Sequence, residues 1–481
     1  MPPIRVLTAL DQARTQYYHF KAIVIAGMGL FTDSYDLFCI APVMKLIGRV
    51  YYAPAAHPSR YVDDDGRRPG PGVTPPAVVS ATVGVALLGA VAGNLVFGGL
   101  GDRVGRRRVY GASLLLMLCA SAGSGFSVCR TRGCALASLC LFRFLLGVAV
   151  GGDYPLSATI MSEFANRRTR GAFIAAVFSM QGFGILASSA VTMAVAAAFD
   201  RYTGRRAPFD DTPEAADLAW RIILMIGAVP AAVTFYWRMA MPETASSTLF
   251  QSQIYRPWFP PAEHANAFQE AFNVAKFQAI IAVASTIPGY FVAVLLIDRV
   301  GRRRLQMAGF FLMAVFLFAL AGPYDRYWRG HATDAWYKVL YALTFFSANL
   351  GPNTTTFILP AELFPARFRS TCHGISGAAG KLGALVGAIG FLWASQDRDR
   401  SKVLAGYEPG IGMMYALIVL GGICLLGLAV TYLFTPETMR RSLEENESQA
   451  AEGDAGQGFQ ELGELPKSPA SMMYTNSHWC T

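Results

Sequence analysis

Charged residues are scarce in this chain. Of its 481 residues, 15% are Asp, Glu, Lys or Arg and 53% are hydrophobic. Soluble globular proteins carry about 25% charged residues, and disordered chains have few apolar side chains, so both classes are excluded. The formal net charge is +9. The basic residues stand in short runs between apolar stretches, which favours a lipid bilayer over nucleic acid as their partner.

Residues that bind metals or form disulfides are also few. The chain has eight cysteines and six histidines, with no Cys-x-x-Cys pair and no His/Cys cluster. The sequence therefore predicts neither a disulfide scaffold nor a zinc site. Since a nucleophile–base pair and a nucleotide-binding loop are missing too, we expect no enzyme activity, no metal and no cofactor. The thiols are expected to be free, although Cys129 and Cys134 flank one predicted external turn and could pair.

Long apolar runs dominate what is present. A helix needs roughly 20 residues to span a bilayer, whereas a β-barrel strand is about half as long. The first run contains Asp33 and Asp36 and has no small-residue cleavage site, which indicates a retained helix rather than a signal peptide. The sequence predicts an all-α membrane protein with eleven transmembrane helices: Ala22–Ile47, Ala77–Leu100, Val109–Cys129, Cys134–Ile160, Gly171–Phe199, Leu218–Trp237, Phe277–Ile297, Leu305–Ala321, Trp336–Leu359, Thr371–Trp393 and Ile411–Phe434.

An internal repeat divides the chain into two copies of one unit. The heptapeptide Asp102–Arg108 (DRVGRRR) recurs identically at Asp298–Arg304, and a Pro-Glu-Thr sequence follows a later run in each copy. Tandem repeats of this kind are typical of secondary transporters. Parallel copies require an even number of spans between the heptapeptides, but five are counted. We infer that the second copy lacks its first helix.

The polar, proline-rich stretch Ser246–Gln269 is a poor candidate for the missing helix. Either the last five helices are inverted or this stretch crosses the bilayer. The predicted plan is a cytoplasmic N-terminus (1–21), a first half of six helices (22–240), a shortened linker (241–276), a second half of five helices (277–434) and a disordered cytoplasmic tail (435–481).

Ionisable residues within the apolar runs are candidates for function, because each is energetically unfavourable in a membrane. They are Asp33 and Asp36 on the first run, Arg143 and Asp153 on the fourth, and Lys381 on the tenth. Acids combined with basic groups suit a site that binds an anion and takes up protons. The alternative is structural ion pairing that merely holds helices together.

Two runs contain sequences that predict helix breaks. Gly151–Pro155 (GGDYP) includes Tyr154, whose phenol could donate to an anion, and a Gly-Pro pair precedes Asn353. Backbone groups freed at such breaks need partners in protein or in a polar cavity. A kink packed by neighbouring helices is the alternative for Gly151–Pro155. Gln181, a lone amide on the fifth run, suits either ligand contact or helix–helix hydrogen bonding.

Charged residues at corresponding helix ends of the two copies predict a network that locks one conformation. A solvated basic loop is the alternative. The candidate residues are Asp102, Arg106, Glu163 and Arg170 in the first copy, and Asp298, Arg302, Glu362 and Arg369 in the second.

Several segments resemble the plant and fungal high-affinity phosphate:proton symporters, a branch of the major facilitator superfamily. They are Gly151–Phe173 (GGDYPLSATIMSEFANRRTRGAF), Phe31–Phe38 (FTDSYDLF), Phe345–Phe357 (FFSANLGPNTTTF) and Pro360–Lys381 (PAELFPARFRSTCHGISGAAGK). The resemblance extends from about residue 15 to about residue 445 with one gap. It implies the major facilitator fold, two six-helix halves with one helix missing here, and uptake of inorganic phosphate with protons at the plasma membrane.

The resemblance also implies roles for individual residues. Tyr154, Gln181 and Asn353 would contact phosphate, and Lys381 would line the central cavity. The proton would be handled by Asp36, Arg143 and Asp153, with Asp33 as a further candidate. Family members carry a long central loop and a seventh helix that supplies a tryptophan, an aspartate and a tyrosine to the site. These three have no counterpart in this chain.

Other functions remain open at this point. The fold could carry a sugar or another organic solute with protons. The missing helix favours a transport-inactive isoform that acts as a sensor or modulator, as a homo-oligomer or a hetero-oligomer with related transporters.

Overall fold

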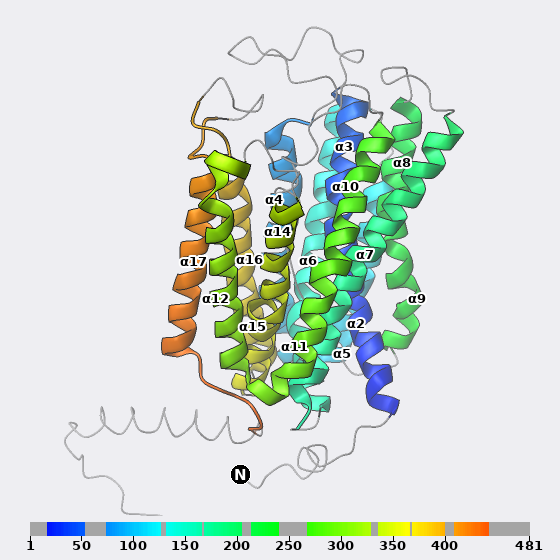
Figure 1. The fold of residues 1–481 in the computed structure, drawn as a ribbon. Coiled ribbons are helices and arrows are strands. Elements are labelled where there is room, and N and C mark those ends of the chain that lie inside the picture. Colours follow the sequence, from blue (N-terminus) through cyan, green and yellow to red (C-terminus); the bar gives the residue numbers. More distant parts are fainter. Residues whose placement is uncertain are drawn as a thin grey trace, which may run out of the picture.

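The computed structural model describes residues 17–52, 74–126, 131–165, 168–203, 213–239, 267–328, 335–365, 368–399 and 408–441. Every regular element within these ranges is a helix, and the helices lie side by side as a bundle (Figure 1). The predicted all-α fold class is confirmed.

The first half extends from the first described helix to residue 239. Its helices are α2 (Tyr17–Phe38), α3 (Ile40–Tyr51), α4 (Pro76–Val104), α5 (Arg106–Gly125), α6 (Arg132–Phe164), α7 (Arg170–Tyr202), α8 (Pro213–Ile226) and α9 (Ala228–Met239). Cys134, near the start of α6, is disulfide-bonded. The expectation that the thiols are all free is therefore wrong at this position, while Cys129 lies outside the described residues.

The second half begins ten residues earlier than the apolar run suggested, at Ala267 instead of Phe277. A π-helical turn at Ala282–Thr286 joins its first two helices into one long span. The elements are α10 (Ala267–Ile281), α11 (Ile287–Val300), α12 (Arg302–Ala321), a π-helical turn (Tyr324–Trp328), α14 (Ala335–Leu350), α15 (Pro352–Leu363), α16 (Arg369–Ala394) and α17 (Met413–Phe434).

All eleven predicted runs are helical in the described part of the chain. Eight helical stretches are long and apolar enough to span a membrane by length and composition. Of the other three, α2–α3 is interrupted at Cys39, α14–α15 is interrupted at Gly351, and α5 begins with three arginines. The chain is thus a multi-pass membrane protein.

The repeated heptapeptide forms the same tight turn in both halves. Gly105 separates α4 from α5 and Gly301 separates α11 from α12, with φ of +97° and +101°. Positive φ is open to glycine at no steric cost. One glycine therefore reverses the chain direction between two long helices, which explains its place in DRVGRRR.

The last five helices are not inverted. At one end of the bundle, the inner end, Asp102 contacts Thr371, and Asp298 contacts Ala172. Both heptapeptides therefore lie at the same end. At the outer end α10 begins beside the end of α3, where Arg49 pairs with Glu270 (Figure 1).

The two predicted helix breaks had different outcomes. The prediction of a break at Gly151–Pro155 is wrong, because α6 continues through it with Pro155 inside the helix. A Cβ on Gly151 would lie 2.2 Å from the carbonyl oxygen of Ala90 on α4. This glycine therefore allows close helix packing. The second break is confirmed: α14 ends at Leu350, and Pro352 begins α15.

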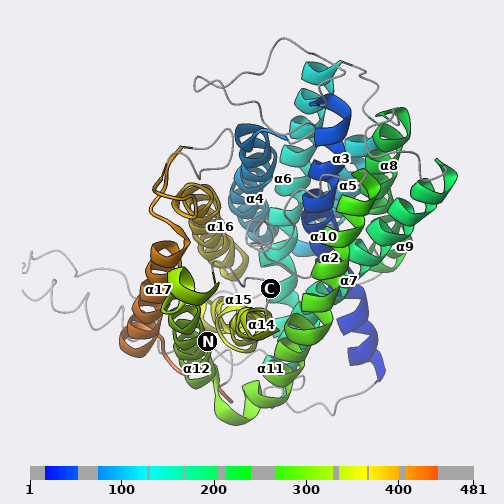
Figure 2. The same ribbon diagram turned by 45° about the horizontal axis from the view of Figure 1, so that its top comes forward.

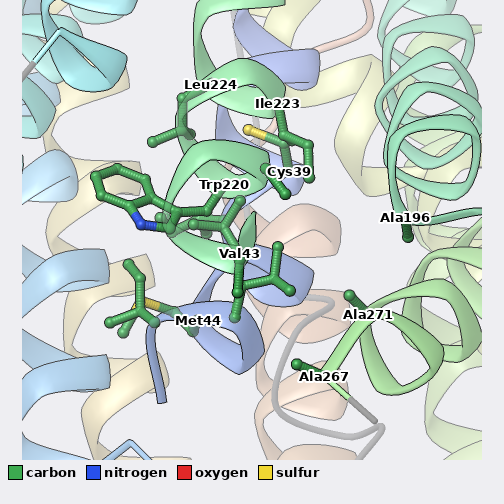
Figure 3. Packing of buried hydrophobic residues seen from close by; sticks show 14 of the residues in the cluster. Cys39, Val43, Met44, Ala196, Trp220, Ile223, Leu224, Ala267 and Ala271 are labelled. Carbon is green, nitrogen blue, oxygen red and sulfur yellow. The ribbon is translucent and has the colours of Figure 1, made fainter. Parts of the chain in front are cut away.

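The halves meet along two helix pairs, α4 with α16 and α7 with α10–α11 (Figure 2). An apolar cluster towards the outer end also bridges them. There, Val43 of α3 and Trp220 of α8 pack in the same core as Ala271 of α10 (Figure 3). Contacts between the halves therefore exist at both ends of the bundle.

Two helices of the second half are less covered than the rest. In each candidate span we compare the share of residues that are buried within the 18-residue segment of high mean hydropathy. This share is 28% in α16 and 22% in α17, against 39–44% in the other six spans. The side of the second half that carries α16 and α17 is thus the most open to the membrane.

Candidate functional site

A buried cation and a phenol meet where the two halves face each other. Nζ of Lys381, on α16, donates a 2.6 Å hydrogen bond to the hydroxyl oxygen of Tyr154, on α6. The same ammonium lies 4.0 Å from the centre of the Tyr154 ring. Both side chains are buried. The carboxylate of Asp33, on α2, is near enough to interact electrostatically with both. We call these three residues the Tyr154–Lys381 cluster.

An amide from the first half meets a second phenol from the other half. Tyr290 of α11 donates a 2.9 Å hydrogen bond to Oε1 of Gln181 on α7. Nε2 of Gln181 is buried and has no hydrogen-bond partner among the described residues. Tyr290 also lies close enough to Tyr154 for an electrostatic interaction. Gln181 thus presents a buried donor group beside the Tyr154–Lys381 cluster.

Asn353 takes its position from the break between α14 and α15. Its Nδ2 donates a 2.8 Å hydrogen bond to Oδ1 of Asn349, so the two amides bracket the interruption at Gly351. Pro352 lacks an N–H, and the polar side chains on either side help to satisfy the disrupted backbone: Thr354 donates to the Asn349 carbonyl.

Asp36 belongs to a separate cluster within the first half. Arg143 of α6 donates a 2.6 Å hydrogen bond to its backbone carbonyl oxygen, and Ser121 of α5 lies 3.1 Å from Oδ1. A Cβ on Gly227, at the α8–α9 junction, would lie 1.9 Å from this Oδ1. Asp153 is fully buried on α6, next to Tyr154. Asp33 and Asp36, one turn apart on α2, therefore face different partners.

An ion-pair network lies at the inner end of the second half. Arg302 of α12 places Nη2 2.7 Å from Glu362 of α15 and Nη1 2.8 Å from Asp298 of α11. Arg302 and Glu362 are only 1% and 3% exposed. Thr438 donates a further hydrogen bond to Glu362. Glu437 accepts hydrogen bonds from the backbone N–H groups of Arg302 and Arg303 at the start of α12.

Two aspartates of the repeated heptapeptides connect the halves in a matching way. Oδ2 of Asp298 accepts a 2.7 Å hydrogen bond from the N–H of Ala172, in the first turn of α7. Oδ2 of Asp102 accepts a 2.7 Å hydrogen bond from the N–H of Thr371, in the first turn of α16. A carboxylate at a helix N-terminus is favourable because orphan donors and the helix dipole both attract negative charge. Asp102 also lies 3.6 Å from Arg106.

The remaining basic residues predicted for this network bind backbone oxygens. Arg170 donates to the carbonyl of Ser162 and to that of Arg441, after α17. Arg369 donates to the carbonyl of Phe364. The side chain of Glu163 lies outside the described residues. No three His, Cys, Asp or Glu side chains gather as a metal site in the described ranges.

Comparisons with known proteins agree with this architecture. The family model "Sugar (and other) transporter" matches residues 21–254 and 267–449. Two rice proteins (Oryza sativa subsp. japonica), "Probable inorganic phosphate transporter 1-9" and "1-10", are 68% and 70% identical, over 98% of this chain and 97% of theirs. "Probable inorganic phosphate transporter 1-8" of Arabidopsis thaliana is 51% identical, over 92% of this chain and 94% of its own.

This chain belongs to the plant inorganic phosphate transporter family. The fold agrees: a solved proton:xylose symporter of the major facilitator superfamily, XylE, covers 90% of the chain and is itself covered to 99%, with a TM-score of 0.65 at 16% identity. The alignment with the first rice relative extends over 572 positions, and this chain has 481 residues. At least 91 of those positions are therefore gaps in this member of the family.

Sequence reasoning missed several polar contacts in this family member. Ser121 and Tyr290 are common residue types that no motif marks, whereas Thr438 belongs to the repeated Pro-Glu-Thr. The partners of all three are distant in the chain. The repeated Pro-Glu-Thr did mark Glu437, but gave no role for it. Its position three residues beyond the end of α17 was the available signal for a helix-capping contact.

Proposed function

We propose that this chain carries inorganic phosphate together with protons across the plasma membrane, with the anion bound at the Tyr154–Lys381 cluster. The observation that supports this most directly is the buried ammonium of Lys381, which is 5% exposed. A buried cation is unfavourable unless negative charge offsets it. Without substrate, Asp33 provides that charge, and a phosphate anion would provide it once Asp33 is protonated.

The neighbouring groups suit a tetrahedral oxyanion. Because Tyr154 accepts its hydrogen bond from Lys381, its own hydroxyl hydrogen remains available to donate. The Nε2 group of Gln181 offers further donors. Asn353, on the short helix after the Gly351 break, is the proposed contact from the second half. Phosphate accepts hydrogen bonds well, so a set of donors with one cation favours it.

Asp33 links phosphate binding to protonation in this proposal. Without substrate, its carboxylate balances the charge of Lys381. Two like charges about 5 Å apart repel by about 3 kcal/mol at an effective dielectric constant of about 20. An anion arriving beside Asp33 therefore favours its protonation, and protonated Asp33 favours the anion. Binding of the two substrates becomes cooperative.

A second proton fits the energetics of uptake. Against an inside-negative potential, each elementary charge is worth about 2.3 kcal/mol per 100 mV. A singly charged phosphate therefore needs two protons to enter with net positive charge. Asp36, with Arg143 and Ser121 around it, is the proposed second carrier. Asp153 stands on α6 between Arg143 and Tyr154.

Transport would also require the inner contacts between the halves to separate and reform. The hydrogen bonds of Asp102 and Asp298 to the opposite half are the proposed lock. The network of Arg302 and Glu362 stays within the second half. It is proposed to keep Asp298 in place as the halves rock.

The test is uptake of labelled phosphate by this chain, at acidic and neutral external pH, in cells that lack their own phosphate transporter. Surface expression is measured alongside. Lys381→Gln should abolish uptake, and Asp33→Asn should make the remaining uptake less sensitive to pH. Lys338→Gln, an exposed lysine on α14, is the matched control and should behave as wild type. No uptake from chain that reaches the surface would refute the proposal.

A second function, modulation of a full-length relative, is favoured by one comparison between the halves. Asp298 binds the N–H of Ala172 at the start of α7, and Asp102 binds the N–H of Thr371 at the start of α16. These matching contacts align Ala172 with Thr371. Gly184 of α7 then corresponds to Gly383 of α16. A Cβ on Gly184 would lie 2.2 Å from the carbonyl oxygen of Phe31 on α2, whereas one on Gly383 has no atom of the described residues within 4 Å. Among the described helices, none occupies in the second half the position that α2 occupies in the first.

The proposed occupant is a transmembrane helix of a full-length family member, because close backbone approach at glycine is how α2 packs in the first half. Co-purification of the two proteins from membranes tests this. Gly383→Leu should abolish it, while Gly422→Leu, on α17 with no described residue within 4 Å of its Cβ position, should not. Equal recovery of the relative with both variants would exclude this function.

A further inference from the structure

We propose that Tyr290 is a positioning residue for phosphate, whose hydroxyl orients the amide of Gln181 so that its NH₂ group faces the anion. This inference rests on the proposed function. It assigns a role to Tyr290, on α11 of the second half, in positioning Gln181, on α7 of the first half.

The contact is short and fully buried. The hydroxyl of Tyr290 lies 2.9 Å from Oε1 of Gln181. Tyr290 is 1% exposed and Gln181 is 0% exposed. The two residues belong to α11 and α7, one of the two helix pairs along which the halves meet. The phenol of Tyr290 is the side chain that hydrogen-bonds the Gln181 amide in the described part of the chain.

The direction of the amide matters for an anion. An amide has a carbonyl oxygen that accepts hydrogen bonds and an NH₂ group that donates two. A carbonyl pointing at phosphate would repel it. With Oε1 bonded to Tyr290, Nε2 points elsewhere, and it has no partner among the described residues. A buried donor without a partner is unfavourable, so an arriving acceptor would bind there.

With the amide turned the other way, Nε2 of Gln181 would donate to the hydroxyl oxygen of Tyr290, because a phenol can accept a hydrogen bond as well as donate one. That orientation would turn the carbonyl towards the anion. Phosphate would therefore select the orientation with Oε1 on Tyr290. A phenylalanine at this position could stabilise neither orientation, and the amide would no longer be preorganised for binding.

The ring of Tyr290 is itself held in place. It packs edge-on against Phe178, with 5.3 Å between ring centres. Phe178 in turn stacks on Phe357 of α15 at 4.9 Å. A Cβ on Gly182 would lie 2.9 Å from the side chain of Ile287, so this glycine allows α11 to approach α7 closely. The hydroxyl therefore has little freedom to leave Gln181.

The experiment measures the dissociation constant of inorganic phosphate from the purified full chain in detergent. The variants are Tyr290→Phe, Gln181→Ala and the double variant. Tyr51→Phe is the matched control, because its hydroxyl donates a 2.8 Å hydrogen bond to Asp217 at the outer end. Each Phe variant removes one buried phenol hydroxyl and leaves the ring.

We expect Tyr290→Phe to weaken phosphate binding by about three- to tenfold, the loss of one neutral hydrogen bond. In the Gln181→Ala background the same change should have no further effect, since the residue it positions is gone. Tyr51→Phe should bind as wild type. In uptake assays Tyr290→Phe should raise KM and leave Vmax per surface copy unchanged.

Gln181→Glu provides a second variant should Tyr290→Phe fail to fold. Its carboxylate still accepts from Tyr290 but replaces the donors with negative charge, and phosphate binding should fall below that of Gln181→Ala. Unchanged binding in Tyr290→Phe, effects that add in the double variant, or equal binding by Gln181→Glu and Gln181→Ala would overturn the inference. Failure of the wild type to bind phosphate would instead overturn the proposed function.

Discussion

Replacing Asp298 by asparagine should loosen the inner contact between the halves without unfolding either half. The carboxylate of Asp298 has two partners, Arg302 in its own half and the N–H of Ala172 in the other. Arg302 retains both hydrogen bonds to Glu362, at 2.7 and 3.0 Å. Its charge therefore stays neutralised, and the second half should remain folded.

The free-energy change expected for Asp298→Asn follows from the contact that Asp298 makes with the other half. Asparagine keeps a side-chain oxygen that can accept from Ala172, so the loss is the negative charge at the N-terminus of α7. Such a charge is worth about 1 to 2 kcal/mol in a partly buried position. The open form of the inner end should therefore become roughly 5- to 30-fold more populated.

Thiol labelling at the opposite helix pair measures this opening. Ser370 of α16 is fully buried beside α4, so Ser370→Cys reacts with a maleimide only when the inner end opens. The labelling rate in Asp298→Asn should rise by the same 5- to 30-fold. Asp217→Asn is the control, because its contacts with Arg221 and Tyr51 stay within the first half. An unchanged rate, or an equal rise in both variants, would refute the reasoning.

Two further predictions use glycine-to-alanine pairs. Gly227→Ala places a methyl group 1.9 Å from the carboxylate of Asp36, so this carboxylate must move. We therefore expect uptake to fall more than tenfold at normal surface expression. Gly422→Ala, which meets no described residue within 4 Å, should leave uptake unchanged. Gly184→Ala meets the backbone of α2 and should lower the melting temperature of the purified protein by several degrees, whereas its counterpart Gly383→Ala should leave it unchanged. Similar melting temperatures for these last two variants would contradict the open position beside α16.

The helix breaks show how far local sequence reasoning extends. Both Gly151–Pro155 and Gly351–Pro352 combine glycine with proline, yet only the second interrupts its helix. Proline removes one donor in either case. In α6, however, Thr159 donates to the carbonyl of Pro155, and the glycines pack against α4. The neighbouring helix, which the local sequence does not show, decides whether the helix continues.

The charged residues show the same division. Apolar runs marked Asp33, Asp36, Arg143 and Lys381 as unusual without any structure, because each is unfavourable in lipid. Which of them would meet could not be read from the runs. Asp33 lies with Lys381, from the other half, and its neighbour Asp36 lies with Arg143.

The sequence by itself determined the all-helical membrane fold, the repeated heptapeptide and the family, while the missing helix of the second copy stays a prediction. These follow from local composition and from identity along the chain, which need no knowledge of contacts. Only the tertiary structure decided that the second half keeps its orientation, that Glu362 pairs with Arg302, and that Tyr290 reaches Gln181. The partners in these contacts are 60 and 109 residues apart. Their meeting depends on how whole helices pack, and small residues that permit close approach set that packing.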